Sequence, residues 1–308
     1  MFSVIIPVHN KAPHLQRSVN SVLNQSYPNF ELILIDDAST DGSSEEILKF
    51  TDPRVKRLRR NTPGPGGYAA RNLGIKEAQN PWIAFLDADD EWKPDHLLNV
   101  AEAIEQNPEI KFFVSGYSLL DTTYERNGNY YVKNHERGSH RFNFSKYLKE
   151  RPAWTGAVVV DRDTIIKAGL FPEGKASRGG DDDLWLKIMS KIRVGYWVNY
   201  LGAVYHRAAV NMVTKTINMD FETMIIYRTV SNLIEQETDK ELILHLKKYW
   251  NHKAWFCFKN ISKRRVIKFN DLKYYFWDAG IIDYKIFTAI FYSFKNLFGR
   301  NDLKPNIG

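Results

Sequence analysis

Three carboxylates follow one apolar run, and their types and spacing make this the stretch best suited to chemistry. Residues 82–86 are apolar and aromatic, which is typical of a buried strand, and Asp87, Asp89 and Asp90 come directly after them. Asp87 and Asp89 flank the small residue Ala88 in a predicted turn, so both carboxylates can face one point. Because carboxylates that close repel each other, the pattern predicts a divalent cation between them.

The same acids also fit a structural interpretation. Pro94 favours the start of a helix, and Asp89 or Asp90 could cap that helix. The position at the carboxyl end of a buried strand favours the functional interpretation, because ligands of open α/β sheets bind at that end.

A second predicted strand also ends in acids. Residues 30–35 are largely apolar, and Asp36 and Asp37 follow them. Further strands are predicted at residues 2–7 and 55–58, with helical spacing of apolar residues between strands. This alternation predicts an α/β fold with a mainly parallel, Rossmann-like sheet flanked by helices.

The turn after the first predicted strand, residues 7–11, contains no glycine. A dinucleotide-binding fold or a P-loop would carry a glycine-rich loop there, so neither is indicated. A diphosphate would therefore need another partner, and a metal ion held by the acids is the candidate.

The composition is that of an ordinary globular protein. The 308 residues suffice for one or two domains, with 44% hydrophobic and 26% charged residues. The lone cysteine, Cys257, excludes a disulfide framework and a cysteine-based zinc site, so we expect a reducing compartment. The chain opens into a predicted strand rather than a secretory signal, and no apolar run approaches the roughly 20 residues of a membrane span. We therefore expect a cytoplasmic protein.

The basic charge lies in the last part of the chain. Residues 241–308 contain 13 Lys or Arg against 5 Asp or Glu, and they hold 16 of the 42 aromatic side chains. Within them, residues 281–298 form a broad apolar face beside Lys285, Lys295 and Arg300, which fits a helix on an anionic membrane surface. A helical bundle packed on the rest of the chain, or across a homodimer, fits the same pattern. No nucleic-acid module is recognisable, so we expect no nucleic-acid partner.

Four segments together resemble the family 2 glycosyltransferases with the GT-A fold. They are residues 3–10, 36–43, 70–75 and 85–90, which stand in the order and spacing of that family. The resemblance is tight to about residue 117, returns at residues 153–207 and is absent from the tail. It implies transfer of a sugar, with inversion at the anomeric carbon, from a nucleoside diphosphate sugar, usually a UDP sugar, with Mn2+ or Mg2+ as cofactor. A glycan or lipid-linked acceptor in cell-surface polysaccharide synthesis is implied as well.

The resemblance also divides the chain. We expect a catalytic domain over residues 1–215, with a nucleotide-sugar half at 1–117 and an acceptor half at 118–215. A helical C-terminal region is expected over residues 216–308.

Several residues match the family's donor-binding positions. Asp37 matches the acid that hydrogen-bonds the uracil, with Asp36 as the second candidate, while Pro7 and His9 match the lining of the base pocket. Arg71 matches a basic residue near the diphosphate. The structural alternatives are that His9 is a plain turn residue and that Arg71 only pairs with a neighbouring carboxylate.

Asp87, Ala88 and Asp89 match the family's metal motif. Asp89 corresponds to the usual ligand of the ion, and Asp87 to the acid that contacts the ribose or a metal-bound water. His206 lies where related enzymes have a histidine or basic residue that reaches the metal or the diphosphate.

The acceptor side rests on fewer residues. Asp181 matches the family's catalytic base, and Asp182 is the alternative because Gly180 stands where the family usually has Glu. A helix N-cap is the structural alternative for Asp181. Trp154 is expected to stack on a sugar or else to pack in the core. The polar, Tyr-rich residues 121–144 lack clear periodicity and are expected to form an acceptor loop.

A nucleotidyltransferase is the rival enzyme class, because it also combines a Rossmann-like sheet with magnesium. That class begins with a glycine-rich loop, which residues 7–11 do not supply. A non-catalytic nucleotide-sugar binding protein is the third alternative, and it would bind UDP without releasing it from a donor.

Overall fold

The computed structural model describes residues 1–209, 218, 220–221, 224–279, 290 and 293. The chain divides into two compact units, residues 1–213 and 214–308, and each is described by itself. The roles expected of residues 1–215 and 216–308 stay predictions.

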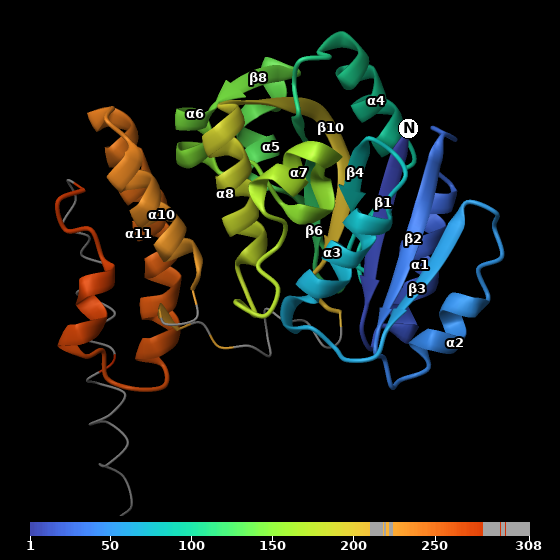
Figure 1. Cartoon of the computed structure of the whole chain (residues 1–308), viewed down its shortest axis with the longest axis horizontal. Helices are drawn as coiled ribbons and strands as arrows, with labels where there is room; N and C mark the ends of the chain where they lie inside the picture. The colour runs from blue at the N-terminus through green and yellow to red at the C-terminus, as the bar shows by residue number, and fades with distance from the viewer. Residues whose placement is uncertain (210–217, 219, 222–223, 280–289, 291–292, 294–308) are drawn as a thin grey trace, which may run out of the picture. The chain divides into compact units, whose positions relative to one another are not determined.

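The first unit is built on a ten-stranded sheet (Figure 1). Its strands are β1 (Phe2–Val8), β2 (Phe30–Asp37), β3 (Val55–Arg60), β4 (Trp82–Phe85), β5 (Glu91–Trp92), β6 (Phe112–Leu120), β7 (Glu125–Asn127), β8 (His140–Asn143), β9 (Val158–Asp161) and β10 (Val194–His206). Its helices are α1 (Ala12–Leu23), α2 (Ser43–Leu48), α3 (Tyr68–Glu77), α4 (His96–Gln106), α5 (Asn129–Asn134), α6 (Phe144–Glu150), α7 (Arg162–Ala168) and α8 (Gly180–Ile192). Single 3-10 turns lie at η1 (Pro65–Gly67), η2 (His135–Arg137) and η3 (Thr155–Ala157).

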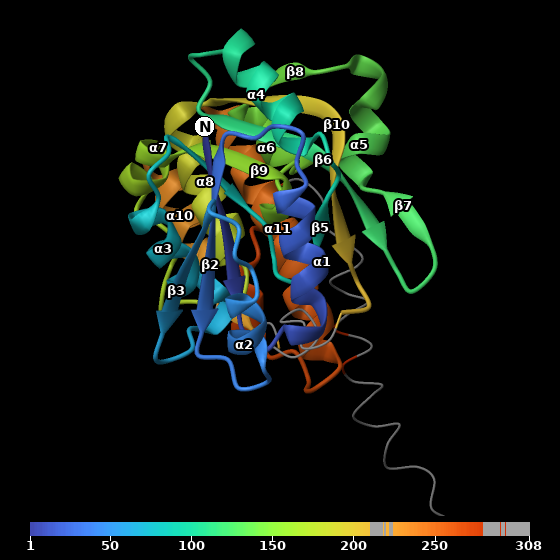
Figure 2. The ribbon, with the colours of Figure 1, turned by 90° about the vertical axis from the view of Figure 1, so that its right-hand side faces the viewer.

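The strand order is β3-β2-β1-β4-β9-β6-β10-β5, with β7 added to β6 and β8 to β10. The pairs β3–β2, β2–β1, β1–β4 and β6–β10 are parallel, and β9 runs antiparallel to both of its neighbours. Figures 1 and 2 show β1, β2 and β3 side by side, so that their carboxyl ends lie at one edge. The predicted α/β fold with a mainly parallel sheet is confirmed.

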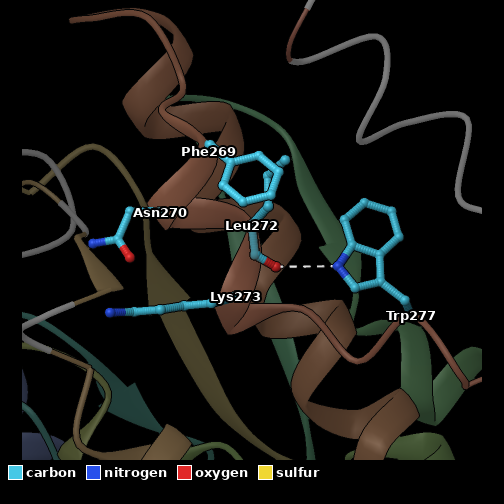
Figure 3. A pocket seen from close by; sticks show the side chains of 5 residues that line it. All are labelled: Phe269, Asn270, Leu272, Lys273 and Trp277. Atoms are coloured by element: carbon cyan, nitrogen blue, oxygen red, sulfur yellow. Dashed lines mark hydrogen bonds between the residues drawn. The ribbon is translucent and has the colours of Figure 1, made fainter.

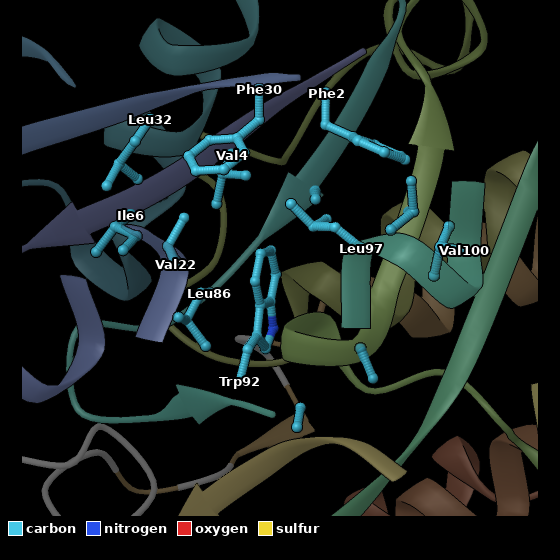
Figure 4. Close-up of a cluster of buried hydrophobic side chains, with 14 of the residues drawn as sticks. Phe2, Val4, Ile6, Val22, Phe30, Leu32, Leu86, Trp92, Leu97 and Val100 are labelled. Atoms are coloured by element: carbon cyan, nitrogen blue, oxygen red, sulfur yellow. The ribbon is translucent and has the colours of Figure 1, made fainter. Parts of the chain in front are cut away.

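The two faces of this sheet differ because side chains alternate along each strand. Val4, Ile6 and Val8 of β1 join a hydrophobic core with α1, α2 and α4, part of which is drawn in Figure 4. Ile5 faces the other way, against α3, where a side chain at Gly74 would come within 2.7 Å of it. Glycine at position 74 therefore lets α3 lie close to β1 and sets the position of the residues at its first turn.

The second face also carries an aromatic cluster that connects the sheet to α8. The ring of Trp185 lies 5.7 Å from Phe85, 5.9 Å from Phe112 and 5.5 Å from Phe171 between centroids. Trp185 and Phe112 are fully buried. This packing fixes α8, and hence the acids of its first turn, relative to β4.

One local expectation is wrong, and two structural alternatives are excluded. Residues 121–144 are not irregular, because they form β7, α5, η2 and β8. Asp89 and Asp90 do not cap a helix, since the short strand β5 follows them and α4 begins at His96. Asp181 is not an N-cap either, because Gly179 occupies that position in a left-handed conformation, with φ of 74°.

The second unit is helical in its described part, as expected. It contains α10 (Ile226–Gln236), α11 (Lys240–Ser262) and the 3-10 segment η5 (Phe269–Tyr274). Its core includes the fully buried Trp250 and Cys257 of α11. The expected amphipathic segment 281–298 lies outside the described residues apart from Ile290 and Ser293, so its membrane or dimer role stays a prediction. In the part of the chain that the structure describes, no helix is long and apolar enough to cross a membrane.

Candidate active site

Asp36 and Asp37 end β2 on opposite faces of the sheet. The Asp36 carboxylate accepts hydrogen bonds from the Ser39 backbone N–H at 2.9 Å and the Ser44 hydroxyl at 2.6 Å, which stabilises the turn into α2. Asp37 instead accepts from the guanidinium of Arg60 and from the backbone N–H of Gly64 at 3.0 Å. The Asp36 carboxylate therefore serves to hold the turn into α2. Asp37 faces the loop before α3, residues 61–67, which contains three glycines.

His9 and Pro7 lie beside this loop and Asp37. The His9 ring donates from Nδ1 to the Asp37 backbone carbonyl at 2.8 Å, which links the turn after β1 to the end of β2. Both interpretations of His9, as a turn residue and as part of the base pocket, are compatible with this contact. A side chain at Gly67 would meet the Arg71 guanidinium at 3.3 Å and the Pro7 ring at 3.6 Å. Gly67 has a φ of 66°, which favours glycine, and the backbone here can approach a ligand closely.

Arg71 connects the loop at residues 61–67 to the acidic segment at residues 87–90. Its guanidinium donates to the Gly66 carbonyl at 2.9 Å and to the Asp87 carboxylate. Although burial disfavours its charge, the carboxylates of Asp87 and, more weakly, Asp181 raise the pKa of Arg71. The cation thus pairs with the acid at the end of β4, and the charge of an acid on α8 adds weakly to its stabilisation.

Asp89 points to a different cation from Asp87. Its carboxylate accepts from the Lys11 ammonium at 2.6 Å, and both side chains are 12% exposed. Arg17 donates to the Asp89 backbone carbonyl. The two acids of the motif are therefore compensated separately, Asp87 by Arg71 and Asp89 by Lys11.

The third acid, Asp90, is fully buried. One of its oxygens accepts from the His206 backbone N–H at 2.8 Å, and the other has no hydrogen-bond partner among the described residues. Burial, with the charges of Asp87 and Asp89 adding to it, raises the pKa of the Asp90 carboxyl well above its usual range. Through the hydrogen bond from His206, Asp90 fastens the turn before β5 to β10.

His206 lies at the end of β10, beside Asp90 and Glu91. Its Nε2 is 3.3 Å from the Glu91 carboxylate, and that contact holds the pKa of Glu91 below its usual value. The imidazole is thus placed against Glu91 rather than beside Asp87. Its expected metal or diphosphate contact stays a prediction.

The three acids of α8 have three different environments. Asp181 accepts from the Thr155 hydroxyl at 3.1 Å, while Asp183 is fully buried and pairs with Lys187 at 2.6 Å. Asp182, between them, is half-buried, as is Asp181. Burial, and after it the negative charge of Asp181, raises the pKa of Tyr68.

Tyr68 connects the donor side to α8. Its phenol oxygen accepts from the Gly180 backbone N–H at 2.8 Å, and its ring would be met at 2.6 Å by a side chain at Gly66. The start of α8 therefore rests on the first residue of α3. Asp181 is positioned by Tyr68 through Gly180 and by Thr155 directly.

Trp154 is half-buried in an aromatic cluster. Its ring centroid lies 4.7 Å from that of Tyr117 and 5.4 Å from that of Tyr205. The side chain also packs against the hydrophobic core. Burial, and after it the charge of Asp182, raises the pKa of Tyr117, so this cluster borders the acids of α8. Trp154 thus combines the two expected environments, with part of the ring in the core and part exposed.

The acids fit a divalent ion only together with further ligands. Among the described residues, no three His, Cys, Asp or Glu side chains converge on one point. Carboxylate oxygens are nevertheless the donors that Mg2+ and Mn2+ prefer, and Mg2+ sites often use one or two carboxylates completed by substrate phosphates. The Lys11 ammonium on Asp89 also shows that this carboxylate accommodates a cation. The residues therefore fit a site that a diphosphate would complete.

Several partners in this site were not identified from the sequence. Lys11, Arg60, Tyr68 and Thr155 each contact a candidate residue or its neighbour. A basic residue in the turn after the first strand was a usable signal for Lys11, and an arginine at the end of β3 was one for Arg60. Thr155 carried no such signal, because it is a single neutral residue in a short 3-10 turn.

Comparison with known sequences identifies the family. The sequence model of glycosyl transferase family 2 matches residues 3–167, and the chain belongs to that family. It is 28% identical to the putative teichuronic acid biosynthesis glycosyltransferase TuaG of Bacillus subtilis over 87% of this chain and 97% of that protein. It is 32% identical over 61% of its length to WfgD of Escherichia coli, a UDP-Glc:alpha-D-GlcNAc-diphosphoundecaprenol beta-1,3-glucosyltransferase of which 70% is covered.

The lengths of relatives differ. An uncharacterized glycosyltransferase of Rickettsia bellii is 36% identical over 63% of this chain, which spans only 27% of that protein. Among solved structures, S. aureus TarS 1-349 in complex with UDP-GlcNAc superposes with a TM-score of 0.74 at 17% identity, over 89% of this chain and 78% of TarS. This likeness confirms the expected GT-A fold.

Proposed function

We propose that the protein is an inverting glycosyltransferase that moves a sugar from a nucleoside diphosphate sugar, with UDP as the nucleotide, to an acceptor hydroxyl. The observation that carries the proposal is the position of Arg71. Its buried guanidinium pairs with Asp87 of the acidic segment and donates to the Gly66 carbonyl of the loop before α3. A buried cation at the carboxyl end of β4 suits a leaving diphosphate.

The nucleotide would be selected by Asp37. A carboxylate accepts the N3 hydrogen of uracil, whereas cytosine offers an acceptor there, so Asp37 favours UDP over CDP. The Asp37 side chain is only 2% exposed beneath Arg60, which is 19% exposed. Donor binding therefore requires the Arg60 guanidinium to move aside or to share the carboxylate, with Pro7 and His9 lining the base.

A divalent ion belongs to the same proposal. Asp89, with Asp87 beside it, would hold Mn2+ or Mg2+ together with diphosphate oxygens, and His206 is a further candidate ligand. When bound, the ion supplies positive charge that stabilises the leaving UDP. Lys11 would have to release Asp89 for this, and its ammonium would remain close to the diphosphate.

On the acceptor side, Asp181 would take the proton of the attacking hydroxyl. Thr155 and Gly180 hold this acid in one orientation. Asp182 is the alternative base. The exposed part of Trp154 offers a stacking surface for a sugar ring of the acceptor.

The acceptor class follows from the relatives. TuaG is a putative glycosyltransferase of teichuronic acid biosynthesis, and the acceptor of WfgD is a diphosphoundecaprenol-linked GlcNAc. We therefore propose a glycan or lipid-linked acceptor in cell-surface polysaccharide synthesis, used at the cytoplasmic side of the membrane.

The test is a panel of UDP, CDP and GDP sugars with release of the nucleoside diphosphate as the signal. We expect UDP release from one donor, dependent on Mn2+ or Mg2+, and its loss in Asp89→Asn with the melting temperature retained. Turnover that survives chelation and that substitution would disprove the metal role. UDP binding in calorimetry without release from any donor would favour a non-catalytic binding protein.

A further inference from the structure

An apolar recess lies in the second unit, beside η5 (Figure 3). It has a volume of about 380 Å3 and is lined by Phe269, Asn270, Leu272, Lys273 and Trp277. The Trp277 indole donates to the Leu272 carbonyl at 3.1 Å, which fixes the ring at the rim of the recess. The polar atom of the indole is thereby satisfied, and its apolar ring remains available.

The aromatic side chains of this recess are unusually exposed. Phe269 is 91% exposed and Trp277 43% exposed. Phe269 is the most exposed of the large hydrophobic side chains in the part of the chain that the structure describes. An isolated exposed ring needs no explanation, but two rings around one apolar recess form a patch that favours a partner.

The exposure of Phe269 is imposed by a well-anchored backbone. The buried Asp271 accepts from the Arg265 guanidinium at 2.7 and 2.9 Å and from the Lys268 backbone N–H at 2.7 Å. At the other end, Asn251 of α11 donates to the Phe276 carbonyl at 2.9 Å and accepts from its N–H at 3.0 Å. With both ends held, Phe269 cannot turn inward without breaking these bonds.

The charge around the recess is positive. Lys263, Lys268 and Lys273 are exposed on the same segment. Its two acids are already compensated, Asp271 by Arg265 and Asp278 by Lys247. Exposed aromatic rings surrounded by lysines are the combination that binds the interface of an anionic bilayer, where rings enter the headgroup layer and lysines meet lipid charge.

We infer that the surface made by Lys268, Phe269, Leu272, Lys273 and Trp277 docks on an anionic lipid bilayer. A glycan is a poorer fit, because among the lining side chains only Asn270 and Lys273 offer hydrogen bonds to hydroxyl groups. This surface lies outside residues 281–298 and is a membrane contact independent of them. It also does not rest on the proposed transferase chemistry.

The test uses the full chain and vesicle flotation. Vesicles of phosphatidylcholine with phosphatidylglycerol should bind the protein at low salt, and pure phosphatidylcholine should bind it at least tenfold less. The double variant Phe269→Ala, Trp277→Ala should lose at least tenfold in binding to the anionic vesicles. The matched control is Phe256→Ala, which removes a 46% exposed ring of α11 and should bind as the unsubstituted chain does.

A second readout separates docking from misfolding. Trp277→Phe keeps an aromatic ring and should retain binding, but it should remove the part of the tryptophan fluorescence that brominated lipids quench. The inference is overturned if the double variant floats like the unsubstituted chain, or if anionic vesicles capture neither protein. It is also overturned if the double variant only lowers self-association in ultracentrifugation, which would assign the patch to a second copy of the chain.

Discussion

In the first unit, Asp87 and Asp89 pair with cations of other elements close to one turn, whereas in the second unit Asp271 pairs with Arg265 six residues away and Asp278 with Lys247 31 residues away. Asp89 and Lys11 are 78 residues apart, and Asp87 and Arg71 are 16 apart. Conversely, the first unit buries its aromatic cluster around Trp185, while the second leaves Phe269 exposed. The fold of the first unit thus brings charged residues together into one site. In the second unit, the ion pairs hold the backbone of a surface segment in place.

The largest expected effect concerns the two acids of α8. Asp181→Asn should lower kcat for transfer about 10²- to 10⁴-fold, the usual contribution of a general base, with the melting temperature unchanged. Asp182→Asn is the matched control and should lose less than about tenfold. Steady-state UDP release with an acceptor measures both. The reverse ranking of the two variants would move the base to Asp182.

The next largest effect is expected from removing the Arg71 guanidinium, which pairs with Asp87. Arg71→Met leaves Asp87 and the Gly66 carbonyl without a donor, so the free energy of unfolding should fall by about 2 kcal/mol. The control Arg59→Met removes a 66% exposed side chain that lies 3.6 Å from Asp36, and it should cost less than about 0.5 kcal/mol. Urea unfolding compares the two. Equal losses would show that Arg71 has no special structural weight.

The third prediction concerns the ion pair between Arg265 and Asp271 in the second unit. Asp271→Asn removes the charge that holds Arg265 and should cost about 1.5 kcal/mol of stability. Hydrogen exchange of the backbone amides in η5 should accelerate, while UDP release stays at the level of the unsubstituted chain. A large fall in kcat would mean that this anchor also serves the chemistry.

The smallest effect is a dependence of stability on pH. Full burial lowers the pKa of His96 from about 6.5 to about 3. Because the folded pKa is depressed, the unfolded chain takes up the proton first, so stability is fully present above about pH 6.5 and is lost as the pH falls toward 3. Between pH 7 and 5.5 the loss should be about 1 kcal/mol. Urea unfolding of His96→Asn should lack this loss, and the exposed control His252→Asn should retain it.

Much of the fold could be predicted from local sequence. Apolar runs followed by Asp36-Asp37 and by Asp87-Ala88-Asp89 are signals that each segment carries by itself, because strand burial and turn chemistry depend on neighbouring residues. For residues 121–144, the local sequence led to the wrong prediction of a loop. Its short elements are stabilised by pairing with β6 and β10, which no local pattern reveals.

The sequence by itself therefore determined the family, the strand ends and the acids that occupy them. Only the tertiary structure decided which of the neighbouring acids share a site. Alternation along β2 sends Asp36 to α2 and Asp37 to Arg60, and the helical period of about 100° per residue gives each of Asp181, Asp182 and Asp183 a different environment. Similarly, Asp90 is buried beneath β10 while Asp89 reaches Lys11. These outcomes depend on partners far along the chain, and it is the packing of whole strands and helices that brings such partners together.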